Sequence, residues 1–191
     1  MKTFKYLFLS ILSLSILVSC SSDDDNPDPV NEEEIITTVR LELTPTTSGE
    51  TVVFQSQDLD GDGPNAPVVT ITGNISASTV YDGEIEFLNE LEDPAEDITL
   101  EVLEEGDEHQ VFYTFTSGNA GSTVIYNDQD EDGNPIGVDI TFNSGVASTN
   151  NTLVVVLRHE PSKTASGVSD GDITNAGGAT DAEVTFTYDV N

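Results

Sequence analysis

Two short segments of the sequence have the spacing of a cation-binding loop. Each has aspartate at three alternate positions followed directly by glycine, at Asp58, Asp60 and Asp62 and again at Asp128, Asp130 and Asp132. Carboxylates at this spacing can surround a hard cation such as calcium, and the glycine permits the sharp bend of the loop. The second segment also has Asp139 at its twelfth position. The pattern predicts calcium sites with Kd values of ~10⁻⁴ to 10⁻³ M; the alternative is that these residues only form turns.

The chain has two histidines, and each stands beside a glutamate at the expected end of a strand. His109 follows Glu108, and His159 precedes Glu160. Imidazole and carboxylate groups together can bind zinc or copper, and two imidazoles can hold haem iron from opposite sides. Three antiparallel reversals separate the strand that starts at His109 from the strand that ends at His159, so both are expected at one rim of the domain. A structural histidine beside an acid is the alternative interpretation.

Motifs of covalent catalysis do not occur in the sequence. We find no nucleophile elbow, no phosphate-binding glycine loop and no Cys-His zinc spacing. Paired carboxylates carry little information in a chain with 36 acidic residues. We therefore expect a binding protein and no enzyme activity.

The charge of the chain limits its partners. The formal net charge is −31, because 36 aspartates and glutamates face only five lysines and arginines. Such a field repels phosphate backbones and attracts cations. Nucleic acid is thus excluded as an expected partner, whereas a cation fits.

The remaining sequence predicts a mainly β domain over residues 35–191. Short runs rich in Val, Ile, Thr, Phe and Tyr alternate with turn residues. We expect nine strands, near residues 35–44, 51–57, 66–73, 79–89, 109–117, 122–127, 136–143, 151–159 and 182–190. Val39, Leu41 and Leu43 share one face of the first run and Arg40 and Glu42 the other, which predicts one buried and one wet face.

Short links between most of these strands predict an antiparallel meander. A meander of this length must fold into a β-sandwich or close into an up-and-down β-barrel to cover its inner face. We favour the sandwich, because the links at 90–108 and 160–181 are long enough to cross between two sheets. The up-and-down barrel is the alternative.

One segment has the signature of a helix. Asp93 is a typical N-cap residue, Pro94 would occupy the first helical position, and Glu96 stands where a capping box needs it. We expect a short helix near residues 94–105 that ends at Gly106. A strand over residues 98–102 is the competing interpretation.

The first 25 residues predict where the protein resides. Lys2 and Lys5 precede an apolar run over residues 6–18, which is too short to span a bilayer as a helix. The run is followed by Cys20, the position at which a lipoprotein signal peptide is cleaved and the cysteine acylated. We expect a signal peptide at 1–19, a lipid anchor at Cys20, and a disordered tether at 20–34, where apolar residues are nearly absent.

These residues also carry a resemblance to known proteins. Cys20 followed by Ser21, Ser22 and Asp23–Asp25 resembles the start of surface lipoproteins of the Bacteroidota, which implies lipid anchoring in the outer membrane with exposure at the cell surface. Much of residues 32–190 is similar to short lipoproteins labelled "type I periplasmic binding fold". The similarity lies in residues 58–63, 88–90, 107–110, 157–161 and 174–178. The label implies substrate capture, but no ligand or site residue follows from it.

Together, these features predict a non-enzymatic lipoprotein at the cell surface. It would bind a ligand or partner through one loop rim and assist nutrient or metal uptake. By analogy with such lipoproteins, a TonB-dependent transporter of the outer membrane is the expected partner. The alternative is a calcium-stabilised adhesion or surface-structural module.

Overall fold

Alternating apolar and polar residues form strands along most of the domain. The computed structural model describes residues 34–61, 63–118 and 121–191, which belong to the compact unit Glu33–Asn191. In β1 (Thr38–Pro45), Val39, Leu41 and Leu43 are buried, whereas Arg40 and Glu42 are only half-buried. This confirms the buried and wet faces predicted for the first strand.

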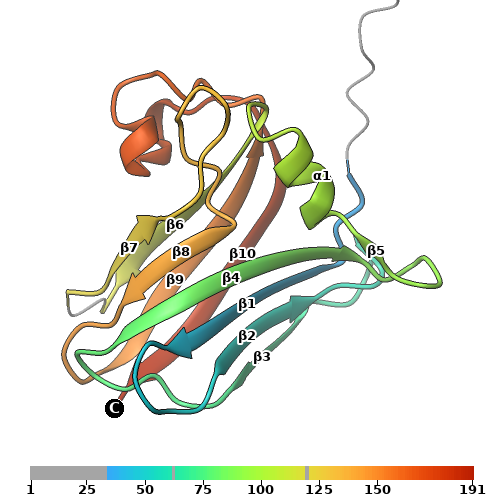
Figure 1. Cartoon of the computed structure of the whole chain (residues 1–191). Helices are drawn as coiled ribbons and strands as arrows, with labels where there is room; N and C mark the ends of the chain where they lie inside the picture. The colour runs from blue at the N-terminus through green and yellow to red at the C-terminus, as the bar shows by residue number, and fades with distance from the viewer. Residues whose placement is uncertain (1–33, 62, 119–120) are drawn as a thin grey trace, which may run out of the picture. The chain divides into compact units, whose positions relative to one another are not determined.

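The strands of the described residues form two sheets (Figure 1). The larger sheet has the order β3-β2-β1-β4-β8-β7, with β5 beside β4. Besides β1 it contains β2 (Val52–Gln57), β3 (Val68–Thr72), β4 (Val80–Asn89), β5 (Glu96–Asp97), β7 (Thr123–Tyr126) and β8 (Asp139–Asn143). The smaller sheet has the order β10-β9-β6 and contains β6 (His109–Ser117), β9 (Ser148–His159) and β10 (Ala179–Val190). The strand pairs are antiparallel throughout.

Aromatic side chains fill the space between the two sheets. Phe54 of β2 lies 5.4 Å from Phe186 and 5.4 Å from Tyr188 of β10, measured between ring centroids. Phe142 of β8 lies 6.1 Å from Phe115 of β6. Because one face of each sheet packs on the other, the domain is the predicted β-sandwich and not the alternative up-and-down barrel.

The order of the connections departs from a simple meander. β4 pairs with β1 instead of β3, so β1 lies inside the larger sheet. The link at 90–108 crosses to the smaller sheet as predicted, but the link at 160–181 does not cross, because β9 and β10 are neighbours. The other crossings use the short links between β6 and β7 and between β8 and β9. Link length was therefore a poor guide to which links change sheets.

The predicted helix exists, but it is shorter than expected. α1 spans Thr99–Glu104, and its N-cap position, Ile98, makes no side-chain cap bond. The predicted start at Asp93 is wrong, because Glu96 and Asp97 pair with the end of β4 and form β5 instead. Ile98 and Val102 are buried, so this segment packs on the core through its apolar residues.

The segment between β9 and β10 covers the outer face of the smaller sheet. It contains two short 3₁₀ helices, Val168–Asp170 and Ile173–Asn175. Val168 and Ala176 pack on Phe112 and Val156 in a second, smaller core. The side-chain amide of Gln110 donates a hydrogen bond of 2.9 Å to the carbonyl oxygen of Val168. Strands β6 and β9 are thus buried on both faces near this end.

Gly178 permits the close return of this segment to His159. Its φ is +70°, and an added Cβ would lie 2.2 Å from the carbonyl oxygen of His159. Gly177 has a φ of +61°, but a Cβ there would meet nothing within 4 Å. We expect Gly177→Ala to cost about 1–2 kcal/mol, because it adds only left-handed strain, and Gly178→Ala to cost more. Urea denaturation of both variants measures the difference, and equal losses would contradict the close approach.

No helix among the described residues is long and apolar enough to cross a membrane. The signal peptide predicted at 1–19, the lipidation of Cys20 and the tether up to residue 33 lie outside the described residues. Glu34, the last residue of the predicted tether, belongs to the folded domain, where its side chain is buried against His109.

Candidate metal centre

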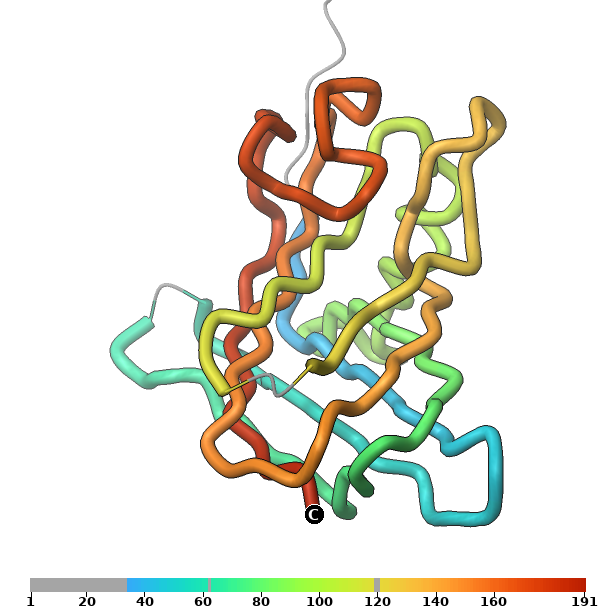
Figure 2. Tube along the Cα trace, turned by 90° about the vertical axis from the view of Figure 1, so that its left-hand side faces the viewer, coloured from blue at the N-terminus to red at the C-terminus, as the bar shows by residue number. Residues whose placement is uncertain are grey.

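The two histidines meet at one end of the sandwich, as the count of strand reversals predicted. His109 of β6 is directly opposite His159 of β9 in the strand register. Their rings are stacked, with centroids 4.6 Å apart and planes at 20°. Figure 2 shows that the segments near residues 105–110, 128–136 and 160–180 gather at this same end. The predicted rim is therefore present.

Two carboxylates complete the group around the histidines. Glu34 Oε1 lies 3.1 Å and Asp181 Oδ2 lies 4.0 Å from His109 Nε2. One ligand atom from each of Glu34, His109, His159 and Asp181 lies within 4.8 Å of the others. The exposed fractions of the Glu34, His109 and Asp181 side chains are 6%, 0% and 2%. We call these four residues the histidine cluster.

The backbone fixes which nitrogen of His109 can serve as a metal ligand. His109 Nδ1 lies 3.2 Å from the carbonyl oxygen of Glu105, which can only accept a hydrogen bond. Nδ1 therefore carries the hydrogen, and in the neutral ring Nε2 presents its lone pair. The Nε2 lone pair and the Glu34 carboxylate then face each other as two acceptors, so a proton or a metal ion must lie between them.

Without a metal, the proton is the expected occupant. Burial lowers the pKa of His109, but the hydrogen bond and the negative charge of Glu34 outweigh it, with help from Glu105 and Asp181. The net effect raises the pKa of His109 above its usual value. A charged His109 paired with Glu34 is the metal-free form of the histidine cluster.

Two buried atoms of the histidine cluster have no hydrogen-bond partner. They are His159 Nδ1 and Glu34 Oε2. Burying such atoms without a partner costs about 1–3 kcal/mol each. A metal ion in the histidine cluster would give His159 Nδ1 a partner.

The donor set matches that of a zinc or copper site. Imidazole and carboxylate are common ligands of both ions. Zinc lies ~2.0–2.1 Å from each nitrogen in a tetrahedral site, which places its ligand atoms about 3.4 Å apart. Ligand atoms of the histidine cluster that lie up to 4.8 Å apart would therefore have to move closer together when zinc binds. The predicted haem arrangement does not fit, because stacked rings cannot approach one iron from opposite sides.

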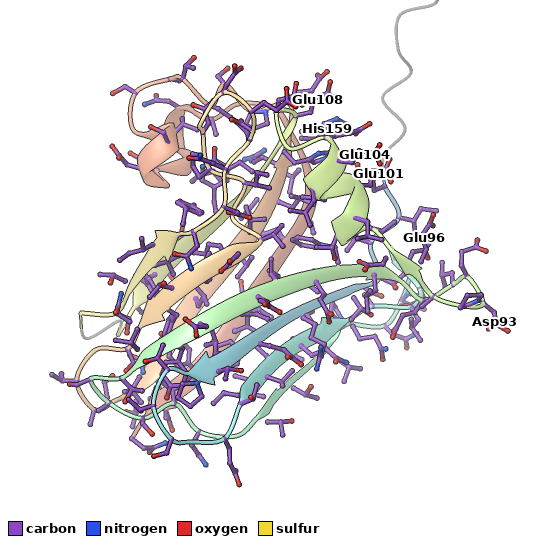
Figure 3. All side chains as sticks on the ribbon, in the orientation of Figure 1. Asp93, Glu96, Glu101, Glu104, Glu108 and His159 are labelled. Carbon is purple, nitrogen blue, oxygen red and sulfur yellow. The ribbon has the colours of Figure 1, made fainter. Side chains whose placement is uncertain are left out.

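The two glutamates predicted beside the histidines lie at the margin of this site. Glu108 Oε2 is 3.5 Å from His159 Nε2, and its side chain is half exposed. Figure 3 shows Glu108 and His159 at the end of the sandwich, beyond Glu101 and Glu104 of α1. Glu160 donates its backbone N–H to the carbonyl oxygen of Glu108, and its side chain is exposed. Neither glutamate belongs to the histidine cluster.

The second aspartate loop has structural partners for its carboxylates. Asp128 accepts hydrogen bonds of 2.7–3.0 Å from the backbone N–H groups of Gly137, Val138 and Asp139. Asp130 accepts from the backbone N–H groups of Asp132 and Asn134, and Asp139 accepts from the side chain of Asn127. No residue of this loop belongs to either group of candidate metal ligands found among the described residues. These contacts match the turn-forming alternative, and calcium binding here stays a prediction.

A buried lysine pairs with one aspartate of the second aspartate loop. Lys163 Nζ lies 3.0 Å from Asp130 Oδ2 and 3.1 Å from the carbonyl oxygen of Pro135, and it also donates to the carbonyl oxygen of Gly106. The exposed fractions of the Lys163 and Asp130 side chains are only 4% and 2%. The ammonium group of Lys163 thus gives the carboxylate of Asp130 a positively charged partner.

The first aspartate loop is exposed, and Asp62 lies outside the described residues. Asp58 accepts a hydrogen bond from the backbone N–H of Asp60, and Asp60 accepts from the side chain of Asn65. These bonds are typical of turns. The calcium prediction for this loop is untested.

Sequence reasoning missed Glu34 and Asp181. Glu34 stands in a stretch of acidic residues, and Asp181 lies at the irregularity between Thr180 and Ala182 in β10. The sequence carried no signal for either residue, because the β-bulge that redirects Asp181 is visible only in the strand register of the structure. Comparisons of the chain with protein-family models, with curated proteins and with solved structures gave no match.

Proposed function

We propose that this chain is a lipoprotein of the bacterial cell surface that captures a transition metal ion, zinc in the first place, with its histidine cluster. The lipid on Cys20 holds it in the outer membrane, and the captured ion is passed on to a TonB-dependent transporter. The protein acts by binding and not by catalysis. The calcium-stabilised adhesion module has less support, because the second aspartate loop is already satisfied by hydrogen bonds and Lys163.

One observation carries the proposal. His109 Nε2 and Glu34 Oε1 face each other at 3.1 Å, and His159 and Asp181 supply further ligands within 4.8 Å. A second point supports it, since the Glu105 carbonyl oxygen orients the His109 ring in the way that outer-shell acceptors orient zinc-bound imidazoles. The strongly acidic chain also concentrates cations near its surface.

Zinc titration of the full-length protein tests this function. We expect one zinc ion per chain at about pH 7.5, and a loss of affinity of roughly 100-fold in His159→Ala and in Glu34→Gln, because each removes a ligand. Glu160→Gln is the matched control, since it removes a neighbouring but exposed carboxylate. Calorimetry and native mass spectrometry without chelator give affinity and stoichiometry. Equal binding by the Glu34→Gln and Glu160→Gln variants would refute the proposal.

A further inference from the structure

Glu34 belongs to a second group of ligand atoms besides the histidine cluster. Glu34, Glu101 and Glu105 each bring a carboxylate oxygen within 4.8 Å of the other two. Glu101 lies in α1, and Glu105 is its C-cap residue. We call these three residues the glutamate cluster. It shares Glu34 with the histidine cluster, and it contains no nitrogen ligand.

Within the described residues, no lysine or arginine compensates the charges of the glutamate cluster, and His109 faces only Glu34. Glu101 and Glu105 are four residues apart along α1, where two like charges destabilise a helix. The last turn of α1 contains no basic residue, and none of the ion pairs found in the described part of the chain brings a lysine or arginine to these three carboxylates. A cation is the simplest group that would stabilise them.

A buried oxygen of Glu34 without a hydrogen-bond partner is a second observation that points to a ligand. Glu34 Oε1 is engaged with His109 Nε2, but Glu34 Oε2 is buried and has no hydrogen-bond partner. The side chain of Glu34 is 6% exposed. A carboxylate with one oxygen toward an imidazole and the other free can bridge two cations.

We propose that Glu34 bridges two metal sites, and that the glutamate cluster binds a second, harder divalent cation such as calcium. Three carboxylate oxygens without imidazole favour hard ions over zinc or copper. Two of the three ligands, Glu101 and Glu105, are exposed, so water molecules complete the coordination. The glutamate cluster can bind its cation without zinc. The bridging role of Glu34 between the two sites rests on the proposed function.

Calcium titration of zinc-loaded and metal-free full-length protein tests this site. Glu101→Gln is expected to weaken one class of calcium sites by roughly tenfold, because it removes one of three charged ligands. Glu104→Gln is the matched control on the same helix, since Glu104 lies outside the glutamate cluster. Its affinity is expected to stay within about twofold of wild type. Calcium held by the aspartate loops would be unchanged in both variants.

The zinc affinity of the same variants separates the two proposals. Glu101→Gln should keep its zinc site, whereas Glu34→Gln should lose both ions. If the protein binds no zinc but Glu101→Gln weakens its calcium binding, the proposed function is overturned and the second site is supported. Identical calcium binding by wild type and Glu101→Gln would overturn the second site.

Discussion

Lys163→Met is expected to destabilise the folded domain by about 3–5 kcal/mol, because it leaves a buried carboxylate without its countercharge. Lys163 Nζ is 3.0 Å from Asp130 Oδ2, and both side chains are almost fully buried. The substitution also leaves the carbonyl oxygens of Gly106 and Pro135 without their shared donor. Because these groups lie on three separate segments, the loss should loosen the whole end of the sandwich that holds the histidine cluster.

Arg40→Met is the matched control for this variant. Arg40 pairs with Glu42 and with Glu86, but its side chain is 30% exposed. Exposed ion pairs contribute about 0–1 kcal/mol, because water screens them. Urea denaturation of both variants gives the comparison. A loss in Lys163→Met no larger than that in Arg40→Met would show that the buried pair does not hold this end of the fold together.

The loss of folding stability at acid pH is a second test of the Lys163–Asp130 pair. Burial raises the pKa of Asp130, but the hydrogen bond from Lys163 and those from Asn134 outweigh it and lower the pKa below its usual value. A lowered pKa contributes stability that is present above the unfolded value of ~3.9 and is lost as the pH falls through the folded value. Wild type should therefore lose more stability than Lys163→Met on acidification below about pH 4.

The histidine pair could be predicted because it depends only on strand count and side-chain parity. An odd number of antiparallel reversals brings the start of one strand to the end of another, and this placed His109 and His159 at one rim. Alternation along the chain also gave the buried face of β1 correctly. Local patterns of this kind predict the structure well, because side chains along a strand always alternate between its two faces.

Glu34 and Asp181 could not be predicted, because nothing local distinguishes them among 36 acidic residues. Their positions follow from long-range pairing, since Glu34 contacts a residue 75 positions away. The acid-rich composition around Glu34 predicted that it belongs to the disordered tether, but its buried contact with His109 places Glu34 in the folded domain. The N-cap signature at Asp93 failed for a related reason, because pairing of the next residues with β4 outweighed the local helix preference.

Lys163 is one of few basic residues in a strongly acidic chain. Beyond residue 20 the sequence has three basic residues, Arg40, Arg158 and Lys163. Among the described residues, the ion pairs of arginine and lysine involve Arg40 and Lys163. The sequence alone does not say which of these pairs is buried. The pattern predicts a cation site in the second aspartate loop, and the structure places the ammonium group of Lys163 beside Asp130. Calcium binding by this loop stays a prediction.

Raising the pH from about 5.5 to about 7.5 is expected to tighten zinc binding by roughly tenfold or more, because His109 Nε2 loses its competing proton. An imidazole with the usual pKa of ~6.5 is about one-tenth neutral at the lower pH and about nine-tenths neutral at the higher one. Such an imidazole gives a roughly tenfold gain in affinity. The raised pKa of His109 enlarges this gain and extends it to higher pH.

The metal-free protein is expected to respond to pH in the opposite direction. His109 is faced by Glu34, Asp181 and His159, and its pKa in the folded state is raised. Its protonated form contributes stability that is complete below the unfolded pKa of ~6.5 and is lost as the pH rises through the folded pKa. Melting curves between about pH 5 and 9, recorded with chelator and with excess zinc, should therefore diverge as the pH rises. Curves that stay parallel would mean that protons and zinc do not compete for His109. Zinc would then not bind between His109 Nε2 and Glu34.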